Sequence, residues 1–337
     1  MKDFWKNKNV LITGINGFVG GNIAKKLSEL KANIFGLLRN NSKKSLLFFE
    51  KIDEKVTLIK GNILDKDLLT RIITEEKIDI IFHFAAQVEV GVSLINPYAT
   101  YETNIKGTYS ILEAVNTSKN KVKAIIFSSS DKSYGAYPKK LMPYKESYDL
   151  RPNYPYEVSK ACADFIAQSY SKAPFNLPIV ICRFSNIYGP GQLNFSALIP
   201  DLIKSYYGYS SFRPRSDGSQ IRDYIFINDV VDLYLIIAQS LFRNKKKFSG
   251  EIFNCGNKKR ISVKKIVQNI YIKDKKRYSK IVNLMKNKKT QGEIEFQFMD
   301  YKKVKSYFNW YPKFDLKTGL KMTTQWYKNF FELSKFY

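Results

Sequence analysis

The chain has 337 residues, of which 44% are hydrophobic and 15% aromatic, enough for one large domain or two modest ones. No apolar run approaches the roughly 20 residues that cross a bilayer, and the N-terminus lacks a signal-peptide pattern, so we expect a cytoplasmic protein without a membrane partner. Three separated cysteines and a single histidine argue against a disulfide framework and a metal site, so we expect no bound metal.

The formal net charge of +26 is compatible with nucleic-acid binding, but its distribution argues against it. Only ten of the 56 basic residues are arginine, and the lysines are scattered along the whole chain. The densest stretch, Lys258–Lys289, has thirteen basic residues and one acid, a composition that also suits a solvated helix surface. We therefore expect no nucleic-acid partner.

The first predicted strand, Asn9–Thr13, runs into the glycine-rich turn Gly14–Gly20, and apolar residues then recur at helical spacing. Strand, glycine turn and helix in this order are typical of a dinucleotide-binding unit, because glycines let the backbone approach the pyrophosphate at a helix N-terminus. The residues of the turn expected to contact the cofactor are Gly14, Asn16, Gly17, Phe18 and Val19.

A second strand is predicted over Asn33–Leu38, and its end favours NADP over NAD as the cofactor. Proteins that bind NAD usually place an acid there to hold the ribose hydroxyls. This chain has Arg39 instead, with Ser42, Lys43 and Lys44 close behind, and such a basic cluster suits a 2′-phosphate. The alternative is an ordinary lysine-rich loop.

Further strands are predicted over Val56–Lys60, Ile78–Phe84, Ala124–Phe127 and Ile179–Phe184, with helical patterns between them, including Pro97–Val115. Strands that alternate with helices predict an α/β protein with a doubly wound, Rossmann-type parallel sheet. We expect further cofactor contacts from residues at or near the strand ends, namely Asn62, Ile63, Ala85, Ala86, Gln87, Asn104 and Ser128.

Tyr156 and Lys160 are the candidate redox pair. Their spacing of four residues places both side chains on one face of a predicted helix. A phenol has a pKa near 10 and needs a neighbouring ammonium and an oxidised nicotinamide to act as a base. Both residues are therefore expected to contact the cofactor and to take part in catalysis, with Ser130 after the fifth strand.

At this point the chain resembles the extended short-chain dehydrogenase/reductase family, which includes NAD-dependent epimerases and dehydratases. The resemblance covers residues 8 to 330 and rests on five ordered motifs, Thr13–Gly20, Phe82–Gln87, Thr103–Thr108, Arg183–Pro190 and Arg222–Asp229. It implies a Rossmann domain mainly in residues 1–178, interleaved with a smaller C-terminal substrate-binding lobe mainly in residues 179–337. It also implies a nucleoside-diphosphate sugar as substrate, with Asn186 and Arg222 near its phosphates.

The resemblance further implies a homodimer, in which helices around Thr100–Asn116 and Tyr156–Tyr170 pair across a two-fold axis. Apolar positions on these helices exceed what one sheet face must cover, and include Ile105, Ile111, Leu112, Phe165 and Ile166.

Asp131 and Lys132, directly after Ser130, resemble the pair typical of 4,6-dehydratases of the CDP-glucose type, and the resemblance therefore implies such a dehydratase more than a sugar 4-epimerase. Both reactions begin with oxidation at C4, but only the dehydratase needs a further acid and base, at C6 and C5. Asp131 would protonate the leaving hydroxyl if burial raises its pKa, and Lys132 would act at C5. The alternatives are a 4-epimerase with these two residues as a surface ion pair, and a non-catalytic NAD(P)-binding regulator, which would not need Ser130, Tyr156 and Lys160.

Overall fold

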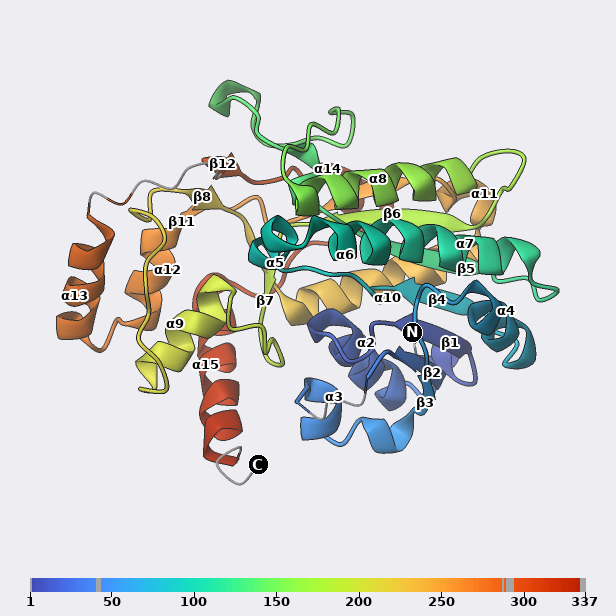
Figure 1. Cartoon of the computed structure of the whole chain (residues 1–337), viewed down its shortest axis with the longest axis horizontal. Helices are drawn as coiled ribbons and strands as arrows, with labels where there is room; N and C mark the ends of the chain where they lie inside the picture. Colours follow the sequence, from blue (N-terminus) through green and yellow to red (C-terminus); the bar gives the residue numbers. More distant parts are fainter. Residues whose placement is uncertain (1, 41–43, 287, 289–293, 334–337) are drawn as a thin grey trace.

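The computed structural model describes residues 2–40, 44–286, 288 and 294–333. A sheet of seven parallel strands forms its centre, in the order β10-β6-β5-β4-β1-β2-β3 (Figure 1). The order reverses between β1 and β4, as in a doubly wound sheet. The strands are β1 (Asn9–Thr13), β2 (Asn33–Leu38), β3 (Thr57–Lys60), β4 (Ile80–His83), β5 (Ala124–Ser130), β6 (Ile179–Phe184) and β10 (Ile252–Cys255).

Helices cover both faces of this sheet (Figure 1), because neighbouring strand residues send their side chains to opposite faces. Ile12 and Ile80 pack with α2 (Phe18–Glu29) and α10 (Ile227–Arg243) in one apolar core. Leu11 and Ile81 belong to a second core, with α4 (Lys66–Glu75), α7 (Gly107–Thr117) and α8 (Pro155–Tyr170). The predicted Rossmann-type architecture is therefore confirmed.

The helix that carries Tyr156 and Lys160 has a well-defined start. Pro155 occupies the first turn of α8, where its missing N–H costs no hydrogen bond. The Glu157 carboxylate accepts hydrogen bonds from the backbone N–H groups of Asn153 and Tyr154, at 3.1 and 3.4 Å. These contacts satisfy N–H groups that the helix leaves free and fix its first turn against the cavity described below.

The helical stretch expected over Pro97–Val115 is interrupted. It consists of α6 (Pro97–Tyr101), a π-helical turn, η2 (Glu102–Lys106), and α7. The wider turn places Asn104 against the backbone of Gln87, from whose N–H its Oδ1 accepts at 2.7 Å and to whose carbonyl its Nδ2 donates at 2.9 Å. Single π-helical turns are often found at functional sites.

The second half of the chain builds a lobe beside the sheet (Figure 1). Its strands form a two-stranded pair, β7 with β9, and a three-stranded sheet in the order β11-β8-β12. They are β7 (Asn186–Tyr188), β8 (Ile221–Arg222), β9 (Tyr224–Phe226), β11 (Ile261–Ser262) and β12 (Phe296–Gln297). The longer helices of this lobe are α9 (Leu198–Tyr206), α12 (Val263–Ile270), α13 (Lys275–Met285) and α15 (Leu316–Leu333). Because β6 and β10 lie in the main sheet, the chain crosses between the two parts more than once.

The remaining helical elements are short: α1 (Lys2–Trp5), α3 (Leu46–Phe49), η1 (Asp53–Lys55), α5 (Val90–Ile95), η3 (Asp131–Tyr134), η4 (Lys139–Leu141), α11 (Lys245–Phe248) and α14 (Lys302–Phe308). Among the residues described, no helix is both long and apolar enough to span a membrane.

Candidate active site

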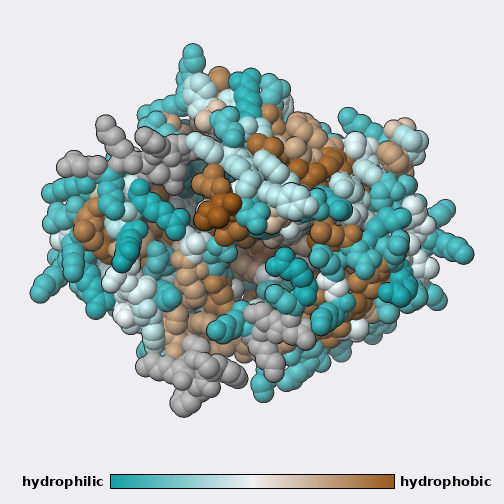
Figure 2. Space-filling model, in the orientation of Figure 1, coloured by the Kyte–Doolittle hydropathy of each residue, from teal (hydrophilic) through white to brown (hydrophobic). Residues whose placement is uncertain are grey.

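One long cavity of about 1360 Å³ runs from the glycine-rich turn, across the carboxyl ends of the sheet strands, into the second lobe. Ligands of open α/β sheets bind at this edge, where the strand order reverses. Figure 2 shows a group of apolar side chains on this face over α5, where Val90, Val92, Leu94 and Ile95 are exposed. Six glycines line the cavity, namely Gly14, Gly17, Gly20, Gly61, Gly91 and Gly191.

The glycine-rich turn is shaped by close backbone contacts. Gly14 has φ +74°, and a Cβ on it would lie 2.8 Å from the Ala85 nitrogen. A Cβ on Gly20 would lie 2.3 Å from the Gly14 carbonyl oxygen. The turn leads directly into α2, whose N-terminus opens toward the cavity edge where a pyrophosphate can bind.

Every residue predicted to contact the cofactor lines this cavity. They come from the ends of β1, β2, β3, β4 and β5 and from η2 and α8, namely Gly14, Asn16, Gly17, Phe18, Val19, Arg39, Asn62, Ile63, Ala85, Ala86, Gln87, Asn104, Ser128, Tyr156 and Lys160. The donor set and the glycine turn fit a dinucleotide. At the end of β2, Arg39 and Lys44 both line the cavity, whereas Ser42 and Lys43 lie outside the described residues.

The single histidine, His83, lies at the end of β4 beside this region and is buried. Its Nδ1 is 2.8 Å from the Thr13 hydroxyl and its Nε2 is 3.4 Å from the Thr108 hydroxyl. Burial, and then the nearby Lys160, lower the pKa of His83 to about 3. The imidazole is therefore neutral and acts as part of the polar frame around the cavity.

Tyr156 and Lys160 lie in the middle of the cavity, on α8. The Lys160 ammonium donates a hydrogen bond to the Ser128 carbonyl. Burial lowers the pKa of Lys160 to about 8, and the carboxylate of Asp164 opposes this shift. Burial raises the pKa of Tyr156 to about 12, and a hydrogen bond with Ser130 opposes that shift. Without a bound cofactor, Tyr156 is therefore a protonated phenol, and the Lys160 ammonium near it gives up its proton more readily than an exposed lysine.

Asp131 is buried, at 3% exposure, in the turn η3 directly after β5. Its Oδ1 accepts from the Ser130 hydroxyl at 3.3 Å, and its Oδ2 has no hydrogen-bond partner among the described residues. Burial raises the pKa of Asp131 to about 6, although Lys132 and Arg222 partly offset it. A surface ion pair, the alternative reading of the sequence, is inconsistent with this burial. Lys132 also lines the cavity.

Asn186 and Arg222 line the part of the cavity that the second lobe closes. Both the backbone N–H and the side-chain amide of Asn186 donate to the Asp223 carbonyl at 3.1 Å. The buried Asp223 carboxylate accepts from the backbone N–H groups of Asn257 and Lys258, and burial raises its pKa to about 7. Asp223 therefore fixes the β8–β9 junction that carries Arg222.

Other residues that line the cavity were not predicted from the sequence, among them Glu89, Tyr98 and Ser185. Ser185 follows β6 and its buried hydroxyl has no partner in the described structure. Its place at a strand end, within the motif Arg183–Pro190, was the available signal. Within the residues described, no group of three or more histidine, cysteine or acidic side chains could hold a metal ion.

Residues 11–323 match the sequence model of the GDP-mannose 4,6-dehydratase family. The chain belongs to this family. Among curated relatives, it is 31% identical over 332 residues to dTDP-D-glucose 4,6-dehydratase of Homo sapiens, covering 96% of this chain and 91% of the relative. It is 29% identical over 337 residues to CDP-glucose 4,6-dehydratase of Salmonella typhimurium, covering 97% and 92%. The predicted family, and its dehydratase branch, are thereby confirmed.

Solved structures include both reaction types. The dTDP-glucose 4,6-dehydratase of Bacillus anthracis in complex with NAD has a TM-score of 0.79 and 27% identity, covering 96% of this chain and 97% of that one. The UDP-glucose 4-epimerase of Thermotoga maritima with UDP-glucose has a TM-score of 0.82 and 26% identity, covering 96% and 99%. Since fold similarity alone cannot separate the two reactions, the residues of the site must do so.

Proposed function

We propose that this member of the GDP-mannose 4,6-dehydratase family converts a nucleoside-diphosphate hexose into its 4-keto-6-deoxy derivative, with loss of one water. One observation carries the proposal: a buried carboxyl of raised pKa, Asp131, lies in the same cavity as Tyr156 and Lys160. Such a carboxyl is protonated near neutral pH more often than a solvated one, and a protonated acid is what expulsion of a hydroxyl requires.

The residues would divide the reaction as follows. When bound, the oxidised dinucleotide supplies the acceptor that takes a hydride from C4 and later returns it to C6, and its positive charge favours the Tyr156 phenolate. Tyr156 takes the proton of the C4 hydroxyl, Ser130 donates a hydrogen bond to O4, and Lys160 orients and polarises the phenol. Lys132 removes the C5 proton, directly or through water, while Asp131 protonates the C6 hydroxyl as it leaves. A proton then returns to C5.

The substrate would lie between the two lobes. Arg222 offers a planar guanidinium suited to a diphosphate, and Asn186 lies on β7, which pairs with β9, the strand that begins two residues after Arg222. Residues of the segment 194–218 line the far end of the cavity, where the base would sit. The identity of the base and of the sugar is tested directly by incubation with CDP-, UDP-, GDP- and dTDP-hexoses and mass spectrometry for loss of water.

A 4-epimerase is the second candidate, because Ser130, Tyr156 and Lys160 serve C4 oxidation in either reaction and a 4-epimerase shares the fold. The panel separates the two: an epimerase returns sugars of unchanged mass, whereas a dehydratase releases water. A non-catalytic regulator would leave every sugar nucleotide unchanged and no hydride transferred, although its cavity would still bind the dinucleotide.

The preference for NADP over NAD remains a proposal, motivated by Arg39 and Lys44 at the end of β2. The dehydratase from Bacillus anthracis is described with NAD. Titration calorimetry with both dinucleotides tests the proposal, and Arg39→Asp should shift the preference toward NAD. Tighter binding of NAD by the wild type would contradict it.

A homodimer and a cytoplasmic location also remain proposals. Of the apolar positions expected at the dimer interface, Ile111 and Leu112 are instead buried in the core of the subunit, because they pack between α7 and the sheet. Phe165 on α8 is 54% exposed and remains available to a partner. Sedimentation at several concentrations tests the dimer, and Phe165→Glu should shift it toward monomer.

A further inference from the structure

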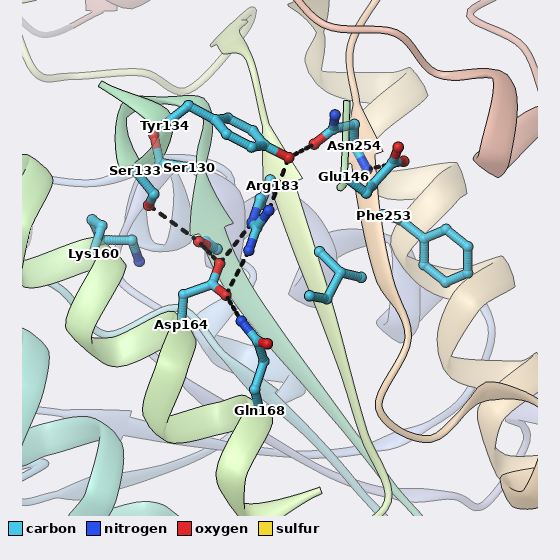
Figure 3. Close-up of polar contacts among 12 residues, drawn as sticks. Ser130, Ser133, Tyr134, Glu146, Lys160, Asp164, Gln168, Arg183, Phe253 and Asn254 are labelled. Atoms are coloured by element: carbon cyan, nitrogen blue, oxygen red, sulfur yellow. Dashed lines mark hydrogen bonds and ion pairs between the residues drawn. The ribbon is translucent and has the colours of Figure 1, made fainter. Parts of the chain in front are cut away.

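A buried ion pair joins α8 to β6, close to Ser130 and Lys160 (Figure 3). The guanidinium of Arg183 on β6 donates to both carboxylate oxygens of Asp164 on α8, through Nε and Nη2, each at 2.9 Å. The two side chains are 2% and 0% exposed. Neither residue lines the cavity. The pair therefore joins two elements of the site without reaching the substrate or the cofactor.

The carboxylate of Asp164 is saturated with donors. Besides Arg183, it accepts from the Ser129 hydroxyl at 2.6 Å and from the Gln168 amide at 2.7 Å. Ser129 belongs to β5, the strand that ends at Ser130. Asp164 follows Lys160 by one helical turn on α8, and its charge favours the protonated form of that lysine. One buried carboxylate thus contacts both the strand and the helix that carry the redox residues.

The guanidinium of Arg183 also contacts η3, through a tyrosine of that turn. Its Nη1 donates to the hydroxyl of Tyr134 at 2.9 Å, and that hydroxyl donates to Asn254 Oδ1 on β10 at 2.7 Å (Figure 3). Tyr134 is the last residue of η3, the turn that contains Asp131 and Lys132. Its ring is buried and stacks on Tyr144, with centroids 4.7 Å apart.

Stability alone does not account for this arrangement. Removing two charges from water costs free energy that their attraction does not reliably return, and buried ion pairs can often be replaced by apolar residues without loss of stability. A buried network of hydrogen bonds does, however, fix relative positions closely. The positions fixed here are those of α8, β5 and η3, which carry the residues assigned above to hydride transfer and to water loss.

We propose that Asp164, Arg183 and Tyr134 are positioning residues that hold the elimination pair, Asp131 and Lys132, in register with the redox pair, Tyr156 and Lys160. This inference rests on the proposed function for the roles of the two pairs. The network connects the two pairs: Asp164 on α8 binds Arg183, and Arg183 in turn donates to the hydroxyl of Tyr134 in η3. A misplacement of about 1 Å in such a site can cost on the order of a hundredfold in rate.

The first test is Tyr134→Phe, which removes one hydroxyl and leaves the stacked ring in place. The matched control is Tyr271→Phe. Tyr271 is also buried, but its hydroxyl lies outside the network and donates to the Leu202 carbonyl at 3.3 Å. In single turnovers, Tyr134→Phe should slow water loss about tenfold or more while C4 oxidation stays within about twofold of wild type. The control should change neither step. Equal rates in Tyr134→Phe and wild type, or an equal loss in both steps, would overturn the inference.

The second test replaces the ion pair with apolar residues, Asp164→Leu combined with Arg183→Met, so that no charge is left buried alone. Thermal unfolding should stay near that of wild type, whereas both C4 oxidation and water loss should fall. Retained rates in a stable double variant would contradict the inference. If the wild type releases no water from any sugar nucleotide, the proposed function is wrong, and the inference is then judged by loss of C4 oxidation in the stable double variant.

Discussion

The two ends of the catalytic cavity are built in different ways. At the glycine-rich turn the backbone itself makes the site, and residues within one short segment, Gly14 to Gly20, fix its shape through close approaches to neighbouring backbone. At the turn after β5 the site depends on side chains, and Asp131 is placed by a network whose members lie up to 120 residues apart. The first kind of site can be recognised from a motif, whereas the second requires the fold.

Substitutions in different parts of the cavity should therefore have effects of different size. The largest effect is expected for Tyr156, in the middle of the cavity. Tyr156→Phe should lower C4 oxidation by about a thousandfold, because it removes the phenol proposed to take the C4 proton. Rapid-mixing absorbance of the reduced cofactor measures this step. Tyr154→Phe, two residues earlier and outside the cavity lining, is the matched control and should react like the wild type.

Asp131→Asn should slow water loss by about a hundredfold while leaving the first hydride transfer possible. The variant should therefore accumulate reduced cofactor and a 4-keto sugar of otherwise unchanged composition, which quenched-flow mass spectrometry detects. Normal water loss in this variant would show that Asp131 is not the acid that protonates the leaving hydroxyl.

The same substitution should make the protein more stable. Burial raises the pKa of Asp131 from 3.8 to about 6, so the wild type loses stability as pH rises through that window, when the buried carboxyl must ionise. The stability advantage of Asp131→Asn over the wild type should therefore grow by about 2.5 kcal/mol in the free energy of unfolding between pH 4 and pH 8. Urea unfolding at both pH values measures it. The control is Asp67→Asn, at a position where the side chain is 93% exposed. It should change the free energy of unfolding by well under 1 kcal/mol.

Gly14→Ala should have the smallest effect of the four, measured as weaker binding of the dinucleotide. A left-handed alanine costs about 1–2 kcal/mol, and its Cβ would press on the Ala85 nitrogen, so dinucleotide affinity should fall about tenfold or more. Gly208→Ala is the matched control, since Gly208 also has a positive φ, +84°, but has open space around it. If both variants bind the dinucleotide like the wild type, the backbone does not shape this end of the cavity.

Much of the sheet followed from the sequence, because buried parallel strands are short apolar runs. The bounds of β1, β2 and β6 agree with those predicted, and β4 is shorter than predicted. β5 extends to Ser130, beyond the predicted end at Phe127, because its three serines continue the parallel pairing with β6. The seventh strand, β10, was not predicted, since it is a four-residue run whose pairing with β6 is set by the fold.

The candidate site divides in the same way. All residues assigned to the cofactor line the cavity, because motif spacing after a strand determines their place. The partnership of Asp164 with Arg183 was not predicted, since Asp164 lies outside the five motifs and the motif that begins at Arg183 does not reveal its partner. Only the burial of both, between a helix and a central strand, gives them a role.

His83 gives this protein an experimental advantage. It is the sole imidazole of the chain, it is hydrogen-bonded to Thr13 at the mouth of the glycine-rich turn, and its pKa of about 3 keeps it neutral across the working pH range. Its ring resonances in a nuclear magnetic resonance spectrum would therefore need no assignment and would not drift with pH. A change in their position on adding a dinucleotide would report occupancy of the cavity from within the native chain, with no label attached.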